Sequence, residues 1–107
     1  MKDGIYYVTF KSNMQDFGNG TVVAKSNTVN GGDFAYSYKG HVNSNSVSLT
    51  IERHDNSVTS VFGNLDSFNL DLSIEESAKG YLLSGNIEGM PQMKITIDAK
   101  YIGDLVS

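Results

Sequence analysis

The stretch FAYSYK, residues 34–39, alternates aromatic residues with small or polar ones. Successive side chains of a β-strand point to opposite faces, so this spacing predicts a strand with one aromatic face, made by Phe34, Tyr36 and Tyr38. The stretch VSLTIE, residues 47–52, alternates in the same way. The two stretches together predict neighbouring strands that each bury one face.

Similar β-rich runs recur along the rest of the chain, and clusters of Gly, Asn and Ser separate them. The further runs predicted as strands are residues 4–10, 21–24, 58–62, 68–73, 81–87 and 93–101. The clusters predicted as turns are residues 17–20, 30–33, 43–46, 54–57, 79–80 and 88–91. Ser73 and Glu76 have the spacing of a capping box, which leaves one helical turn as an alternative to the hairpin at Lys79-Gly80.

These expectations define a fold class. Eight strands in 107 residues give about 13 residues for each strand with its turn, which is typical of sandwiches and barrels. No amphipathic segment is long enough for a crossover helix, and short turns favour an up-and-down meander. Closing that meander would remove both sheet edges. We therefore predict one all-β domain over residues 1–107, a small antiparallel up-and-down β-barrel of about eight strands.

Charge and composition exclude several partners. Lys and Arg number 8 against 12 Asp and Glu, for a formal charge of −4. The basic residues are scattered along the sequence, so we expect neither direct nucleic-acid binding nor binding to an anionic membrane surface. The chain has no cysteine, no signal-peptide pattern and no apolar run of the ~20 residues that span a bilayer. We expect a cytoplasmic protein.

Residues with chemical potential are few. His41 and His54 are the only histidines, and the acidic residues near them in sequence, Glu52 and Asp55, lie at a strand end and a polar turn. Solvated turn residues explain this pattern better than a catalytic base or a metal site, which needs convergent partners. No phosphate loop or nucleophile motif is present. We predict neither enzyme activity nor a cofactor.

The aromatic residues are the more informative group. Tyr6, Phe34, Tyr36 and Tyr38 are candidates for a ligand cavity or an interface, because tyrosine combines an apolar ring with a polar hydroxyl. Ordinary core packing is the plainer explanation. Residues 4–10 are apolar on both faces of the predicted strand, and Val22-Val23 and Leu82-Leu83 repeat the pattern. A covered outer face predicts either a loop packed over it or a homodimer.

Three blocks of sequence resemble the GrlR family. The first is Met1-Lys2-Asp3-Gly4-Ile5-Tyr6 with Phe10, Ser12-Asn13 and Gly18-x-Gly20; the second is Gly31-Gly32-Asp33-x-Ala35-x-x-Tyr38-x-Gly40; the third is Asp98-Ala99-Lys100-Tyr101-Ile102 with Leu105-Val106. The resemblance runs nearly end to end. It implies a lipocalin-like β-barrel that forms homodimers and negatively regulates type III secretion genes. It also implies that regulation proceeds by binding a transcriptional activator, without contact to DNA.

One loop departs from that family. Its best-known member carries a Glu-Asp-Glu-Asp patch implicated in contacting the activator, whereas the matching loop here is Asn43-Ser44-Asn45-Ser46. Loss of this charge should change the partner or weaken the contact, because charge steers and selects partners. We take Asn43, Ser44, Asn45 and Ser46 as the candidate partner-binding residues. The alternative function is a lipocalin-like barrel whose strand aromatics line a cavity for an apolar small molecule.

Overall fold

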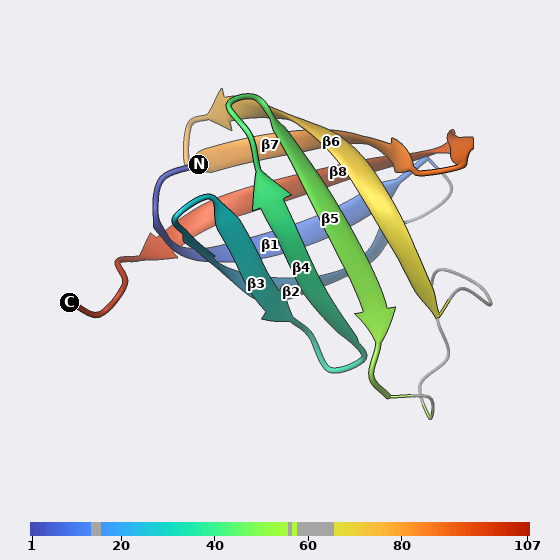
Figure 1. Ribbon diagram of the computed structural model, residues 1–107, viewed down its shortest axis with the longest axis horizontal. Helices are drawn as coiled ribbons and strands as arrows, with labels where there is room; N and C mark the ends of the chain where they lie inside the picture. Colours follow the sequence, from blue (N-terminus) through green and yellow to red (C-terminus); the bar gives the residue numbers. More distant parts are fainter. Residues whose placement is uncertain (14–15, 56, 58–65) are drawn as a thin grey trace.

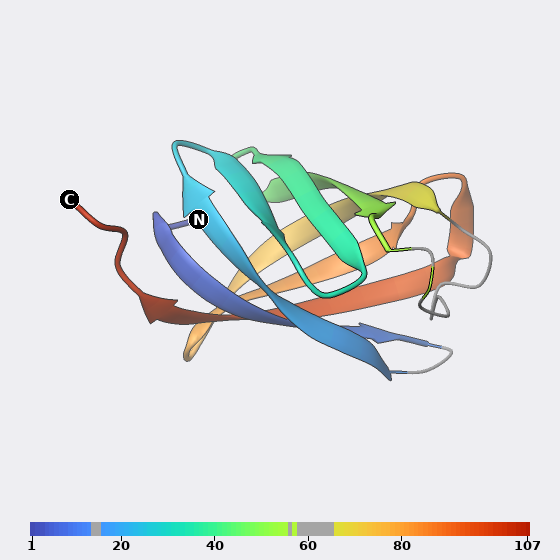
Figure 2. The ribbon, with the colours of Figure 1, turned by 90° about the horizontal axis from the view of Figure 1, so that it is seen from below.

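A computed structural model describes residues 1–13, 16–55, 57 and 66–107, with the side chains of residues 16 and 17 left out. The described residues form eight β-strands that close into a barrel (Figures 1 and 2). The strands are β1 (Gly4–Ser12), β2 (Asp16–Lys25), β3 (Thr28–Gly32), β4 (Tyr36–Val42), β5 (Ser46–Arg53), β6 (Ser67–Ser77), β7 (Gly80–Ile87) and β8 (Met90–Gly103). No helix long and apolar enough to cross a membrane occurs among these residues.

Each strand pairs antiparallel with the next one along the chain, and β8 pairs with β1 to close the barrel. This arrangement confirms the predicted fold, a small antiparallel up-and-down barrel. The turns at residues 26–27, 43–45, 78–79 and 88–89 are short. Asn43 N–H donates to the Ser46 carbonyl over 2.8 Å in the turn between β4 and β5, and Ala78 and Lys79 connect β6 to β7.

Several element boundaries differ from the prediction. The cluster at residues 30–33 is wrong as a turn, because Asn30 to Gly32 belong to β3. The cluster at residues 17–20 is also wrong as a turn, since it lies inside β2. No helical turn follows Ser73, because β6 continues through Ser77. The strand predicted at residues 58–62 lies outside the described residues.

These two clusters were predicted as turns because they contain glycine, but glycine here allows neighbouring strands to pack closely. A Cβ on Gly20 would lie 2.9 Å from the Tyr38 ring, and one on Gly31 would lie 2.7 Å from the Cα of Val22. Both distances are shorter than real Cβ contacts allow. Glycine in a strand marks such close approach as well as turns. Gly20 therefore leaves room for the Tyr38 ring, and Gly31 allows β2 and β3 to approach closely.

The barrel interior is the hydrophobic core. Inward positions alternate with outward ones along every strand, as in β5, where Val47, Leu49 and Ile51 are buried and Ser48 and Glu52 are exposed. All buried side chains among the described residues are hydrophobic or tyrosine. A filled interior is what an eight-stranded barrel of this size permits.

The barrel has two open ends, which we call mouths. The N-terminal mouth is formed by residues 1–3 and the turns at 26–27, 43–45 and 78–79, and the C-terminal segment also leaves the barrel there (Figure 1). The opposite mouth is formed by the loop at 33–35, the turn at 88–89 and the ends of β5 and β6 that face it. The two mouths differ in how their polar groups are satisfied.

Candidate binding surfaces

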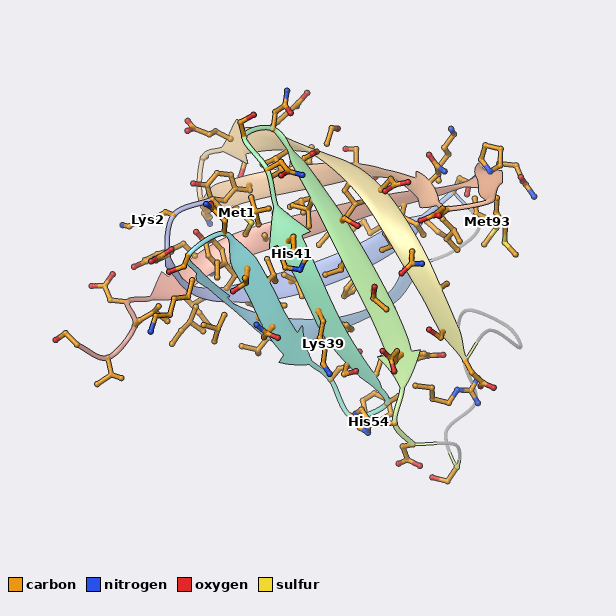
Figure 3. The ribbon with its side chains drawn as sticks, viewed as in Figure 1. Met1, Lys2, Lys39, His41, His54 and Met93 are labelled. Atoms are coloured by element: carbon orange, nitrogen blue, oxygen red, sulfur yellow. The ribbon has the colours of Figure 1, made fainter. Side chains whose placement is uncertain are left out.

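The interior contains one small cavity near its middle. The cavity measures about 20 Å³ and has no polar lining; Val8, Phe10, Val22, Tyr38, Leu49 and Ile97 contribute to its wall, and Met1 covers it from the N-terminal mouth (Figure 3). A water molecule needs ~10–15 Å³ of such space together with polar partners, so this cavity is expected to be dry. Its volume is far below the ~300 Å³ of the smaller ligand sites.

The four candidate aromatics do not line a common cavity. Tyr6, Tyr36 and Tyr38 point inward and are buried, but only Tyr38 among them reaches the cavity wall. The prediction for Phe34 is wrong in part: it lies in the loop before β4, and its side chain is 75% exposed. The loop forms because Asp33 accepts hydrogen bonds from the backbone N–H groups of Ala35 (2.8 Å) and Tyr36 (2.7 Å). The alternation of inward and outward side chains therefore begins only at Tyr36.

Asp33 also accepts a hydrogen bond from Tyr38, at the mouth opposite the N-terminus. The Tyr38 hydroxyl donates a hydrogen bond to Asp33 Oδ2, and the Tyr38 ring packs 5.0 Å from the ring of Phe10 between centroids. Burial, together with the bond to Asp33, raises the pKa of Tyr38 well above its usual range. His54 Nε2 lies 2.9 Å from the Asp33 carbonyl oxygen and donates to it. Both oxygens of the Asp33 carboxylate thus accept hydrogen bonds that hold the loop and Tyr38 in place.

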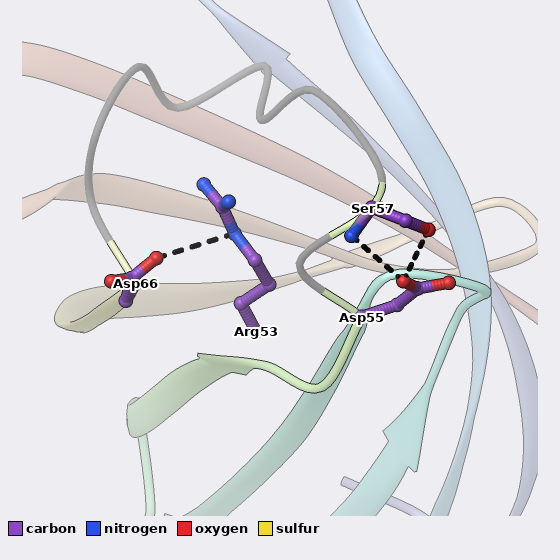
Figure 4. A network of polar contacts seen from close by, with 4 residues as sticks. All are labelled: Arg53, Asp55, Ser57 and Asp66. Atoms are coloured by element: carbon purple, nitrogen blue, oxygen red, sulfur yellow. Dashed lines mark hydrogen bonds and ion pairs between the residues drawn. The ribbon is translucent and has the colours of Figure 1, made fainter.

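The remaining polar contacts at this mouth are local. Asp55 Oδ1 accepts from Ser57 N (2.9 Å) and Ser57 Oγ (2.6 Å), which lowers the pKa of Asp55, and Arg53 Nε lies 3.4 Å from Asp66 Oδ1 (Figure 4). His41 lies on the outer surface of β4, apart from His54 (Figure 3). Within the described part of the chain, no three His, Asp or Glu side chains are grouped to hold a metal ion.

The predicted partner-binding loop forms one wall of a groove. Asn43, Asn45 and Ser46 lie beside the outer surfaces of β5, β6 and β7, where Ser48, Asp71, Ser73 and Ser84 complete a polar groove of about 530 Å³. Ser73 Oγ donates to the Ser84 carbonyl over 3.1 Å. We call this the loop groove. Its hydroxyl and amide groups suit hydrogen bonding to another polypeptide, and Asp71 is its one charged residue.

The outer surface of β8, β1 and β2 is unusually apolar. Tyr7 is 40% exposed, Val23 37% and Ile102 53%. Ile5 pairs with Val23 on one side and Gly103 on the other, and Ile102 is the extra residue of a β-bulge opposite Ile5 and Tyr6. We call Ile5, Tyr7, Val23 and Ile102 the apolar face. It agrees with the sequence pattern of two apolar faces in residues 4–10, while Leu82, which repeats that pattern in the sequence, lies apart on β7.

A third surface feature, at the N-terminal mouth, was not predicted from the sequence. Tyr6, Tyr81 and Tyr101 meet there beside Lys2, Lys79 and Lys100 in an open cleft of about 410 Å³. We call it the tyrosine cleft. The three lysines are up to 98 positions apart in the chain, so their sequence spacing gives no hint of a cluster. The closest signal is the β7–β8 hairpin, whose register places Gly80 opposite Lys100.

Comparison of the sequence with known protein families and with curated proteins finds no match.

Proposed function

We propose that this protein is a cytoplasmic, protein-binding β-barrel that negatively regulates type III secretion gene expression by holding a transcriptional activator. The observation that carries the proposal is the size of the interior cavity, about 20 Å³. This cavity, lined by described core residues, is too small for a ligand, and we infer that the protein acts through its outer surface. The small-molecule alternative would require core side chains to leave their positions, at a cost set by close packing.

The sequence blocks that resemble the GrlR family have structural roles in this barrel. Asp33 accepts the hydrogen bond of the Tyr38 hydroxyl. Gly31 allows the backbone of Thr21 and Val22 to approach, and Gly4 allows the ring of Tyr101 to approach, where a Cβ would overlap it. These residues therefore have roles in forming the barrel itself. The regulatory role follows from the resemblance and is the part that needs an experiment.

The loop groove is the surface we assign to the activator. Asn43 and Asn45 are exposed, and the backbone of their turn is fixed by the bond from Asn43 to Ser46 and by Ile74 N–H donating 3.0 Å to the Asn45 carbonyl. A fixed turn with exposed amides loses little conformational entropy on binding. Because the loop carries no carboxylate, we expect contact by hydrogen bonds, with weaker salt dependence than an acidic loop would give.

The test is a reporter assay with a type III secretion promoter and its activator, with and without this chain. We expect the chain to lower reporter output, and the double substitution Asn43→Lys with Asn45→Lys to restore it. Asn30→Lys is the matched control, since Asn30 is an exposed asparagine on β3 outside the groove. Sedimentation of the purified activator with each variant should follow the same order.

Unchanged reporter output with the wild-type chain, together with no complex in sedimentation, would reject the regulatory proposal. A small apolar molecule retained in native mass spectrometry would favour the alternative function. Equal loss in the control and the loop variants would move the contact away from the loop groove.

The apolar face is the surface we assign to a second copy of the chain. Closed barrels have no strand edges to pair, so a dimer must bury a face. We expect a dimer in analytical ultracentrifugation, and a monomer after Tyr7→Lys with Val23→Lys. Gln92→Lys, an exposed position near the start of β8 and far along that strand from Ile102, should leave the dimer in place. A wild-type monomer at high protein concentration would reject the assignment.

A further inference from the structure

The tyrosine cleft concentrates positive charge on an acidic protein. The chain has a formal charge of −4, yet Lys2, Lys79 and Lys100 all line this cleft, with Glu76 as the one carboxylate in its wall. Two further carboxylates lie nearby: Asp3 Oδ1 accepts from Ser26 N over 3.1 Å, and Asp104 accepts from the Tyr101 hydroxyl. Three lysines and one carboxylate therefore line the cleft, and Asp104 adds a negative charge where it bonds Tyr101.

Aromatic rings form the floor beneath these lysines. The Tyr6 ring lies 5.9 Å from the Tyr81 ring and 5.5 Å from the Tyr101 ring, at interplanar angles of 54° and 81°. Lys2 Nζ lies 4.5 Å from the centroid of the Tyr101 ring. The floor thus offers aromatic ring surfaces next to the Lys2 ammonium, and Lys2 lies at the N-terminal mouth (Figure 3).

Backbone hydrogen bonds hold the main chain at two of these lysines in place. Lys2 N–H donates to the Tyr81 hydroxyl over 3.0 Å, and the Tyr6 hydroxyl donates to the Lys2 carbonyl over 2.6 Å. Tyr101 N–H donates to the Lys79 carbonyl over 2.9 Å. Lys100 lies opposite Gly80, where a Cβ would overlap the Ala99 carbonyl oxygen. These bonds therefore place the main chain of Lys2 and Lys79 beside the tyrosines of the cleft.

We propose that the tyrosine cleft binds a small organic anion, a carboxylate or phosphate carried on a flat, unsaturated body. The lysines would pair with the anionic group, and the tyrosine rings would contact the flat body. The cleft volume of about 410 Å³ lies within the ~300–1,000 Å³ range of small-molecule sites. The cleft shares no lining residue with the loop groove, so the proposal does not rest on the regulatory function. Lys100 lies opposite Tyr7 of the apolar face, so the oligomeric state of each variant is measured beside its affinity.

The test is an NMR titration of the full chain with phenyl phosphate and with benzoate as probes. We expect saturable shifts of the amides of Lys2, Tyr81 and Tyr101, with benzyl alcohol, a neutral ring, binding about tenfold more weakly or worse. Inorganic phosphate should also bind more weakly than phenyl phosphate, because it cannot use the rings. Added salt should weaken both anionic probes, since exposed charges are screened.

Substitution separates this cleft from general charge effects. Lys79→Ala with Lys100→Ala should weaken phenyl phosphate binding by about tenfold or more. Lys25→Ala with Lys39→Ala is the matched control, because it removes the same charge from exposed positions outside the cleft. All four lysines are exposed, so both variants should fold, and their amide spectra verify this.

Three results would overturn the proposal: equal affinity for benzyl alcohol and phenyl phosphate, shifts located elsewhere on the barrel, or the same loss in the control variant. Absence of saturable binding by either anionic probe would overturn it as well. Binding of a glutamate-rich peptide in place of the small probes would assign the cleft to a protein partner and equally reject a small-molecule site.

Discussion

The two mouths of the barrel both use buried tyrosine, but they treat charge in opposite ways. At the mouth opposite the N-terminus, Tyr38 donates to Asp33, whose carboxylate also accepts from two backbone N–H groups. At the N-terminal mouth, Tyr6 donates to a backbone carbonyl, and three lysines around it extend into an open cleft. At one mouth the Asp33 carboxylate holds a loop, whereas at the other three lysines line the proposed binding site. The tyrosines are hydrogen-bonded at both ends, and the proposed site uses the charges of one end.

The largest expected effect tests the similarity between the mouths. Tyr6 and Tyr38 are 0% and 2% exposed, so Tyr6→Ala and Tyr38→Ala should each lower the free energy of unfolding by about 3–5 kcal/mol. Urea denaturation followed by circular dichroism measures this. A loss below about 1 kcal/mol at either position would show that this mouth does not depend on its tyrosine.

The next effect isolates the charge at the opposite mouth. Asp33→Ala removes the acceptor of the Tyr38 hydroxyl and of the N–H groups of Ala35 and Tyr36. We expect a loss of about 2–3 kcal/mol in the free energy of unfolding, because buried donors are left without partners. Asp33→Asn keeps an acceptor oxygen and should lose less. If alanine and asparagine behave alike, the carboxylate does not hold the loop in the way described.

Alkaline pH should weaken both mouths together. Burial is the main reason that the pKa of Tyr6 rises to about 12 and that of Tyr38 rises further. Because the folded state disfavours the tyrosinate, the stabilisation is fully present below the unfolded tyrosine pKa of about 10 and is lost as pH rises through and above it. Urea midpoints should therefore be flat from pH 7 to about 9.5 and fall beyond pH 10. The double substitution Tyr6→Phe with Tyr38→Phe should flatten that fall, and an unchanged fall would assign it to other groups.

Much of the barrel could be predicted from sequence because alternation is a local property. Residues 47–52 alone define which side chains of β5 face inward, and the short turns define the meander. The roles of Gly20 and Gly31 could not be predicted from the sequence, because they depend on contacts with other strands: Gly20 with Tyr38, and Gly31 with the backbone of β2. The strand at Thr28–Gly32 was missed for that reason.

The surfaces were less predictable than the core. The apolar face was visible in residues 4–10, whereas the exposure of Ile102 depends on a bulge between β1 and β8. The grouping of Lys2, Lys79 and Lys100 depends on barrel closure, which brings the first and last strands together. Scattered lysines in the sequence gave the opposite expectation, that no basic cluster exists.

The smallest expected effect sharpens the contrast between the mouths. Lys2→Ala removes an exposed ammonium and its contact with the Tyr101 ring, but the backbone bonds of Lys2 with Tyr6 and Tyr81 do not depend on its side chain. Exposed cation–π contacts contribute about 0.5–1 kcal/mol, so the loss in the free energy of unfolding should stay below about 1 kcal/mol, measured by urea denaturation beside Asp33→Ala. A loss as large as that of Asp33→Ala would mean that the Lys2 side chain also stabilises the N-terminal mouth. The charge at the N-terminal mouth would then be structural, and the contrast between the two ends of the barrel would disappear.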